Sequence, residues 1–420
     1  MRVPLRLLYL AALPITFALA VCSPVTRTFV STSSGDAGGF GPGGVGGFGL
    51  GGAGGFGPGG GAGTGGCDGG SCVVCPAGET ACTSGCSMLD TDTDCGACGH
   101  ACGAGSTCST GFCTPVTVCT GLGSSGALAL FGGNAYTAAG QSVPMCSLAT
   151  TGGTSVNLWH TGLLFVQATT VAADPKSLYF VTHSSFSPSN PTDALDQSDG
   201  MAGSFTDVDD YPAPWPSSYV TTLDDPSTGN VFAVLQTSVE QVLLSQATDA
   251  GVPAHTCLSV GTSAVITSAS AGGGKLFVAS SAAGTVVGAT VTGTTCTTAT
   301  TLASGLSMPG AVATDGTTVA FADASGVYAC NAALGCVPEA TPTPLVTGQG
   351  TVSGIVMDTA ATPNLYWIGS SGLVTCSSEA SQCKGKATVL VPNATPTSAL
   401  AVDATYVYYV QGNVLSRVAR

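Results

Sequence analysis

The sequence contains few charged side chains and very few basic ones. Charged residues make up 8% of its 420 residues, against about a quarter in ordinary globular proteins. Lysine and arginine together number nine, and none lies between Arg27 and Lys176. Nucleic-acid binding needs clustered basic residues that displace counterions from phosphates, and electrostatic adhesion to an anionic bilayer needs a polybasic segment. The sequence therefore excludes a nucleic-acid partner and a polybasic membrane-binding surface.

Residues that favour helices are also scarce. Glutamate occurs only four times, whereas Thr, Ser, Val, Ala and Gly dominate the composition. These residues are typical of strands and turns rather than helices. Because 44% of the residues are hydrophobic, the chain can nevertheless bury a core. The sequence therefore predicts an all-β fold.

Groups that commonly carry out catalysis are sparse. The four histidines are His100, His160, His183 and His255, and none belongs to a His-x-x-x-His or His-Glu pair. No G-x-S-x-G motif stands between a strand and a helix. Because catalysis needs positioned acids, bases, nucleophiles or metals, we predict a protein that is not an enzyme and has no resident cofactor. The alternative is a secreted lyase or glycosidase that uses His183 with Asp or Tyr side chains.

The N-terminal residues have the pattern of a bacterial signal peptide. Residues 1–20 contain a positive start, an apolar stretch and an A-x-A cleavage site. The next residues, Val21 and Cys22, complete a segment that resembles the bacterial lipoprotein box, although that family has a small residue where this chain has Val21. Lipidation of Cys22 would leave eighteen of the nineteen cysteines, which can all pair. The alternative is simple cleavage after Ala20.

Residues 21–66 are expected to form a flexible Gly-rich linker. Residues 35–66 contain 20 glycines and three copies of an eight-residue repeat marked by Phe40, Phe48 and Phe56. Such a chain spans roughly 35–40 Å between its ends. If Cys22 carries lipid, the linker holds the rest of the chain clear of an outer membrane.

Residues 67–119 are expected to form a small disulfide-rich module, because so few residues cannot bury an adequate apolar core. The ten cysteines of this module are Cys67, Cys72, Cys75, Cys82, Cys86, Cys95, Cys98, Cys102, Cys108 and Cys113. A zinc site is the alternative, since Cys72 and Cys75, like Cys95 and Cys98, have ligand spacing.

The run CPAGETACTSGCSMLDTDTDCGACGHACGAGSTCSTGFC resembles the repeat of the stigma-specific cysteine-rich secreted family. Similar modules occur in bacterial, notably myxobacterial, surface proteins, and the resemblance implies an extracellular module without known catalysis. Within it, Asp90, Asp92 and Asp94 alternate as in the first half of a Ca²⁺-binding loop. The later positions of such a loop are Cys95 and Ala101 here, so turn-capping aspartates are the alternative.

Residues 120–420 repeat a pattern of short apolar strands and turns, which predicts a β-propeller. Seven anchor positions recur every 42 to 53 residues, and this period with several strands per unit is typical of propeller blades. The anchors are Phe131, Tyr179, Phe232, Phe277, Ala320, Tyr366 and Tyr408. We expect seven blades, with six or a pair of β-sandwiches as alternatives. The segment from Cys113 to Leu122 should complete the last blade, so that no edge stays open.

Turn residues and cysteines recur at matching places in the repeats. Asp174, Asp315, Asp358 and Asp403 precede the aromatic strand, where Asp caps a hairpin turn. Two disulfides are predicted in successive copies, Cys330 with Cys336 and Cys376 with Cys383. The remaining cysteines, Cys119, Cys146, Cys257 and Cys296, allow three pairings.

Residues 186–216 enlarge the longest repeat and are the candidate ligand site. We expect a long loop, because long loops on a rigid scaffold often carry function. Its carboxylates could bind Ca²⁺, and its aromatic rings could contact a carbohydrate or peptide. The candidate residues are Asp193, Asp196, Asp199, Asp207, Asp209, Asp210, Tyr211 and Trp215.

These observations favour an exported bacterial protein, either tethered to the outer membrane or secreted. Nineteen cysteines indicate an oxidising compartment. The expected function is non-catalytic binding of an extracellular protein, glycan or matrix partner. A secreted enzyme and a self-associating coat protein are the alternatives.

Overall fold

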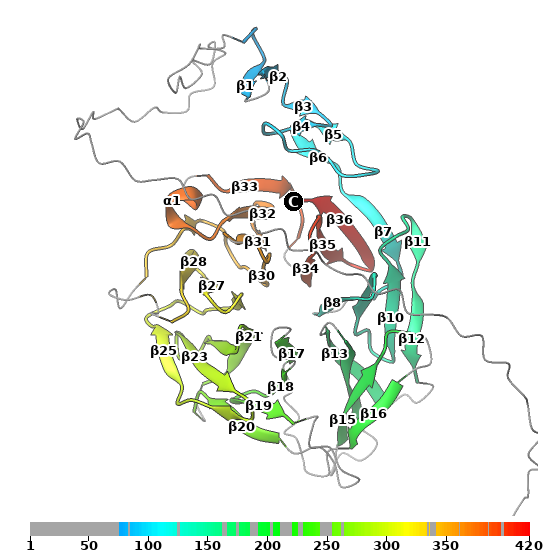
Figure 1. The fold of residues 1–420 in the computed structure, drawn as a ribbon, viewed down its shortest axis with the longest axis vertical. Coiled ribbons are helices and arrows are strands. Elements are labelled where there is room, and N and C mark those ends of the chain that lie inside the picture. Colours follow the sequence, from blue (N-terminus) through cyan, green and yellow to red (C-terminus); the bar gives the residue numbers. More distant parts are fainter. Residues whose placement is uncertain are drawn as a thin grey trace, which may run out of the picture. The chain divides into compact units, whose positions relative to one another are not determined.

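The computed structural model describes most of the chain after residue 74 (Figure 1). The described ranges are 75–82, 85–123, 127–161, 166–173, 176–184, 192–201, 205–210, 221–225, 230–243, 254–261, 264–333, 336, 342–360, 362–384, 386–395 and 399–420. They belong to one compact unit, Gly61–Arg420. No helix within these ranges is long and apolar enough to cross a membrane. The predicted signal peptide, Cys22 and the Gly-rich linker lie outside the described residues.

Three short hairpins and four disulfides form the N-terminal part. The hairpins are β1 (Thr80–Cys82) with β2 (Gly85–Ser87), β3 (Asp90–Thr91) with β4 (Asp94–Cys95), and β5 (Cys108–Ser109) with β6 (Phe112–Cys113). The disulfides join Cys75 to Cys86, Cys82 to Cys98, Cys95 to Cys108, and Cys102 to Cys113. Covalent links here take the place of a large apolar core. Cys67 and Cys72 lie outside the described residues.

Seven sheets follow as the blades of a propeller (Figure 1), and their strands pair antiparallel except for the short strand β11. Blade 1 contains β8 (Leu128–Phe131), β9 (Asn134–Thr137), β10 (Ser142–Ser147) and β12 (Val156–His160). Blade 2 contains β13 (Val166–Ala173), β14 (Leu178–Ser184), β15 (Thr192–Ser198) and β16 (Phe205–Asp210). Blade 3 contains β17 (Thr221–Asp225), β18 (Asn230–Val234), β19 (Ser238–Val242) and β20 (Ala254–Ser259). Blade 4 contains β21 (Ile266–Gly272), β22 (Lys275–Ser280), β23 (Thr285–Thr292), β24 (Thr295–Cys296) and β25 (Thr300–Ala303).

The last three blades complete the ring. Blade 5 contains β26 (Ala311–Thr314), β27 (Thr318–Asp323), β28 (Gly326–Asn331) and β29 (Val346–Thr347). Blade 6 contains β30 (Ile355–Met357), β31 (Asn364–Gly369), β32 (Gly372–Ser377) and β33 (Thr388–Val391), with the one-turn helix α1 (Ala380–Cys383) before β33. Blade 7 contains β34 (Leu400–Val402), β35 (Tyr406–Gln411), β36 (Val414–Ala419), β7 (Val116–Thr120) and β11 (Gly153–Thr154).

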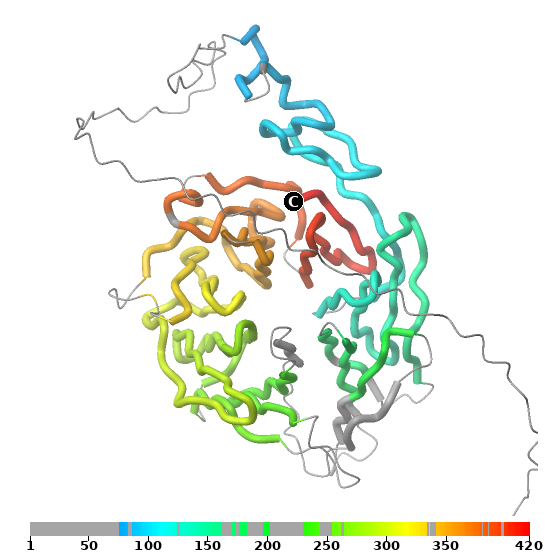
Figure 2. The backbone as a smooth tube through the Cα atoms, in the orientation of Figure 1, coloured from blue at the N-terminus to red at the C-terminus, as the bar shows by residue number. Residues whose placement is uncertain are grey.

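The backbone visits the blades in sequence order around the ring (Figure 2). The first strand of each blade contacts the first strand of the next, and β34 of blade 7 contacts β8 of blade 1. The prediction of seven blades is therefore confirmed, and six is wrong.

Strand β7 closes the ring as predicted. It pairs antiparallel with β36 on one side and parallel with the short strand β11 on the other. Blade 7 therefore contains strands from both ends of the propeller sequence, and β36 has no open edge. The domain boundary drawn after residue 119 cuts through β7.

The second strand of each blade is buried on both faces. Their fully buried large side chains include Phe180, Phe232, Phe277, Phe321 and Trp367. In β22, Phe277 packs with Phe321 of blade 5, while Leu276 packs with Phe232 of blade 3. A strand covered on both sides needs no polar face, which explains the continuous apolar runs in the sequence.

One anchor of the sequence pattern is wrong. Phe131 ends β8, the first strand of blade 1, whereas the other anchors lie on second strands. The equivalent buried aromatic residue is Tyr136 on β9. The longest apolar run of blade 1, Ala127–Phe131, belongs to its first strand, so hydrophobicity alone placed the anchor one strand too early.

Four disulfides lie in the propeller, and two of them join neighbouring blades. Cys119 of β7 pairs with Cys146 of β10, and Cys257 of β20 pairs with Cys296 of β24. The first links blade 7 to blade 1, where the ring closes, and the second links blade 3 to blade 4. The other two, Cys330–Cys336 and Cys376–Cys383, lie within blades 5 and 6 and are the pairs that the repeats predict.

Candidate functional site

The acidic segment of blade 2 is not the long loop that the sequence suggested. Asp193 and Asp196 lie on β15, and Asp207, Asp209 and Asp210 lie on β16, the outer two strands of the blade. In FTDVDD, Asp207 and Asp209 alternate with Val208, which suits a β-strand, whereas TDALDQS shows no such alternation. Charge and prolines in the same stretch had obscured that pattern.

The strand register brings several of these carboxyl-bearing residues into neighbouring positions. Asp196 is opposite Asp207, with a register shift beside them, and Asp193 is opposite His183 of β14. The Asp196 side chain is only 5% exposed and accepts a hydrogen bond of 3.2 Å from the Thr182 hydroxyl.

The remaining members of the candidate set lie beyond these strands. Asp199 follows β15 and accepts the Met201 N–H at 2.9 Å. Tyr211 and Trp215 lie outside the described residues. The structure thus keeps five of the six aspartates together on two strands. An edge strand such as β16 also uses charge to discourage pairing with another sheet.

The aspartates of the N-terminal part bind backbone groups of the same part. Asp92 Oδ1 accepts the Cys108 N–H at 2.6 Å, and Asp94 Oδ1 accepts the Gly99 N–H at 2.7 Å. The Gly99 bond lowers the pKa of Asp94, because it favours the ionised carboxylate. Asp90 lies on β3, opposite Cys95. Two of the three Ca²⁺ candidates therefore brace loops that carry disulfides.

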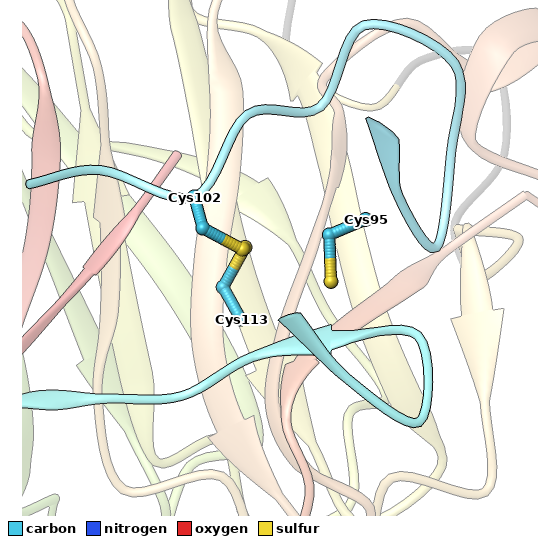
Figure 3. Close-up of side chains that lie close together, drawn as sticks. All are labelled: Cys95, Cys102 and Cys113. Carbon is cyan, nitrogen blue, oxygen red and sulfur yellow. A yellow bond between two sulfur atoms is a disulfide. The ribbon is translucent and has the colours of Figure 1, made fainter. Parts of the chain in front are cut away.

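Three sulfur atoms of this region lie close together. Cys102 is bonded to Cys113, and the sulfur of Cys95 lies beside that disulfide (Figure 3). The three sulfurs are within 4.8 Å of one another. Zinc binds thiolates, whereas these sulfurs are in disulfides, because Cys95 is bonded to Cys108. The spacing of Cys95 and Cys98 therefore reflects two different disulfides in this structure rather than a shared metal ion.

A second group combines a histidine with a disulfide. His255 Nε2 lies 3.8 Å from the sulfur of Cys296, which is bonded to Cys257. All three residues lie at the junction of blades 3 and 4. Because both sulfurs are in the disulfide, the histidine borders a covalent link between blades.

The turn aspartates cap their turns as predicted. Oδ1 of Asp315 accepts the Thr317 and Thr318 N–H groups at 2.8 and 2.6 Å. Oδ1 of Asp403 accepts the N–H groups of Thr405 and Tyr406 at 2.7 and 2.8 Å. Asp174 lies outside the described residues.

The sequence did not indicate that the aspartates also bind tyrosine hydroxyls. Tyr366 donates to Asp358 at 3.2 Å, and Tyr408 donates to Asp403 at 2.8 Å. Burial raises the pKa of Tyr366 to about 12, and the Asp358 carboxylate adds to the shift. Arg420 forms an ion pair of 2.9 Å with the same carboxylate. The two tyrosine–aspartate bonds lie within blades 6 and 7, and the Arg420–Asp358 ion pair joins the two blades.

The comparisons with known proteins support the fold alone. No protein-family model and no curated protein matches the sequence. Among solved structures, the WD40 β-propeller domain of Doa1 has a TM-score of 0.50 and 9% identity, covering 73% of this chain and 97% of that chain. A structure of YCF48 bound to D1 peptide has a TM-score of 0.47 and 10% identity, covering 73% and 96%. A nidogen/laminin complex has a TM-score of 0.38 and 13% identity, covering 58% and 89%.

The class of protein follows from these findings. The chain is an all-β, seven-bladed β-propeller preceded by a disulfide-rich segment. The disulfides of the chain indicate an oxidising or extracellular environment.

Proposed function

We propose that this protein is a non-catalytic binding protein of the bacterial cell surface or the secreted fraction. The propeller presents its connecting segments to an extracellular protein, glycan or matrix partner. In the tethered form, a lipid on Cys22 and the Gly-rich residues 35–66 connect it to the outer membrane.

The main support for this proposal is that many of the described ionisable side chains form hydrogen bonds that stabilise the fold. Asp315, Asp323, Asp358 and Asp403 each accept backbone N–H groups of turns. Burial raises the pKa values of Tyr366 and Tyr408 above the ordinary value of about 10, so their phenol groups lose a proton even less readily than ordinary tyrosines. Such groups stabilise a scaffold and are poorly suited to proton transfer.

Rigidity favours the same function. The ring is joined across blades by Cys119–Cys146 and Cys257–Cys296. A preorganised surface loses little conformational entropy on binding, which benefits a binding protein directly.

A binding and activity screen of the mature, disulfide-bonded protein tests the proposal. We expect retention of one partner class on glycan and extracellular-protein arrays, with no turnover of pooled polysaccharide, glycoside or uronate substrates. His183→Ala should leave binding unchanged. Turnover that His183→Ala abolishes would support the lyase or glycosidase alternative. Assembly into polymers without any ligand, lost on removal of residues 35–66, would support a coat protein.

A further inference from the structure

The topology divides the connecting segments of the propeller between two faces. In a four-stranded antiparallel blade, the link from the second to the third strand and the link to the next blade lie at the same end. The links from the first to the second strand and from the third to the fourth lie at the other end. We call the first end the crossover face and the second the hairpin face.

The described residues of the crossover-face segments include no charged residue. Within blades, the described links are residues 138–141, 235–237, 281–284, 324–325, 370–371 and 412–413. Between blades, the described residues of the links are 121–123, 127, 161, 260–261, 264–265, 304–310, 348–354, 392–395 and 399. None of these described residues is Asp, Glu, Lys or Arg.

The hairpin face has the opposite composition. Among the described residues, its segments contain Lys176, Asp199, Asp315, Asp358, Glu379, Lys384, Lys386 and Asp403. The chain as a whole has a net charge of −14, so the absence of charge from one face is not a consequence of a neutral composition.

Strand residues near the crossover face change this contrast in three blades. Asp323 ends β27 but is 5% exposed, and it accepts hydrogen bonds from Ser307 N–H and the Tyr328 hydroxyl. Asp193 and Asp210 lie near the ends of β15 and β16. In blade 3, Glu240 accepts the hydroxyl of Ser238, the first residue of β19, at 3.2 Å. The uncharged area therefore extends over blades 4 to 7, with acidic residues on blades 2 and 3 beside it.

The described part of this face exposes hydroxyl groups and two larger apolar side chains. Ser307, Ser325, Ser370 and Ser371 are exposed, Met308 is 69% exposed, and Val265 is 37% exposed. Met308 has a φ of 53°, which is unusual for a residue with a side chain.

Bonds from two blades hold the Met308 loop in place. Its neighbour Leu306 donates a backbone hydrogen bond of 3.0 Å to Gly284 O of blade 4. Pro309 O accepts the Thr267 hydroxyl at 2.7 Å, and Ser307 N–H binds Asp323 of blade 5 at 2.9 Å.

One buried polar atom lies at the same end of blade 4. The hydroxyl of Ser280, the last residue of β22, is completely buried and has no hydrogen-bond partner. Buried hydroxyls are normally satisfied. The unpaired hydroxyl lies next to the crossover segment 281–284.

We infer that the crossover face of blades 4 to 7 binds an uncharged polysaccharide. The inference rests on the proposed binding function and specifies its partner. A polyanion would be repelled by the acidic chain, and a polycation would find its counter-charges on the hairpin face. A neutral sugar chain exchanges its water hydrogen bonds for those of Ser, Thr, Gln and backbone groups, and its apolar ring faces can contact Met308.

Binding to such a surface should be nearly independent of salt, because no ion pairs contribute. The probes are dextran, mannan, starch and β-1,3-glucan as neutral polymers, with alginate, heparin and chitosan as charged ones. We expect at least one neutral polymer to bind, and the charged ones not to.

Double variants on each face test which face of the propeller binds the polysaccharide. The double variant Met308→Asp with Ser371→Asp adds charge to exposed positions of the crossover face, and Asp tolerates the φ at position 308. It should weaken binding by about tenfold or more, as loss of a central contact does. Met308→Asn with Ser371→Asn tests shape without charge and should weaken binding less.

The matched control adds the same charges to exposed positions of the hairpin face. Thr359→Asp with Ala404→Asp should leave the affinity unchanged, and circular dichroism shows whether each variant folds. Equal loss in both aspartate variants, or binding of charged polymers only, overturns the inference.

Other outcomes separate the inference from the proposed function. Binding of an extracellular protein but of no polysaccharide leaves the proposed function intact and refutes this inference. Binding that requires residues 35–66 of another copy points to self-association and also refutes it. Failure to bind any probe on either array contradicts the proposed function itself.

Discussion

At the scale of single residues, aspartates with adjacent hydroxyl partners stabilise the turns. Asp358 accepts bonds from Ala360 N–H, Asn364 N–H, the Tyr366 hydroxyl and Arg420. The carboxylate is buried, and burying a charge is costly unless it is paired and hydrogen-bonded. The network satisfies that requirement and joins the hairpin of blade 6 to the last residue of blade 7.

The raised pKa of Tyr366 predicts a loss of stability at high pH. Its ordinary pKa is about 10, and burial raises the pKa to about 12 in the folded protein. The folded state therefore keeps the phenol proton to higher pH than the unfolded state. The stability that results is complete below about pH 10 and is lost as the pH rises to about 12.

Tyr366→Phe removes this ionisation and tests whether it causes the predicted loss of stability at high pH. Thermal unfolding measured from pH 8 to pH 12 should show a smaller alkaline decrease for the variant than for the parent protein. At pH 8 the variant should be less stable by about 1 kcal/mol, because one buried hydrogen bond is lost. If the variant loses as much stability between pH 8 and pH 12 as the parent protein, the loss comes from other buried tyrosines. Tyr408 is one of them, because burial also raises its pKa.

At the scale of elements, the propeller depends on one strand that comes from outside its C-terminal repeats. Strand β7 provides the fourth position of blade 7, next to β36. The Cys119–Cys146 disulfide fixes β7 to β10 of blade 1, and Arg417 of β36 donates to Leu148 O at 3.0 Å. These bonds oppose opening at the point where the ring is not continuous along the chain.

Removing disulfides of different span tests the importance of closure. Cys119 and Cys146 are 27 residues apart, and Cys330 and Cys336 are 6 apart. In the chain-entropy model a longer loop stabilises more, by roughly 1 kcal/mol for this difference. Cys119→Ser with Cys146→Ser should therefore lower the free energy of unfolding more than Cys330→Ser with Cys336→Ser. Denaturant unfolding of both variants measures this, and equal losses would contradict a special role for closure.

At the scale of the whole molecule, the ring supports itself through packing between blades. Clusters of buried side chains extend from blade to blade, as between Phe277 and Phe321 or between Ile355 and Ala311. The Cys95 and Cys113 sulfurs belong to the same apolar cluster as Ile368, Val391 and Val418 of blades 6 and 7. The disulfide-rich part therefore packs on the propeller and is not a free appendage.

The export prediction is tested by intact mass together with alkylation of free thiols. Sixteen cysteines form the eight disulfides of the described residues. If Cys22 is lipidated, protein from the membrane fraction should begin at a diacylated Cys22 and show no alkylation. A soluble chain that begins at Val21 with one alkylated cysteine would contradict the tether, while leaving the propeller unaffected.

The sequence by itself determined the fold class, the number of blades and the closing segment. Runs such as Leu178–Val181 and Val407–Val410 are apolar at every position, which is typical of strands covered on both faces. Their regular spacing gives the blade count. The turn-capping aspartates were equally predictable, because a capping bond joins residues only a few positions apart.

Only the tertiary structure decided features that join distant parts of the chain. It paired Cys119 with Cys146, placed Asp193 and Asp209 on neighbouring strands, and brought Arg420 to Asp358. It also separated the charged connecting segments from the uncharged ones, because alternate links of an antiparallel blade emerge at opposite ends. The sequence contains these segments in a single series, and the direction of each strand assigns them to one face or the other.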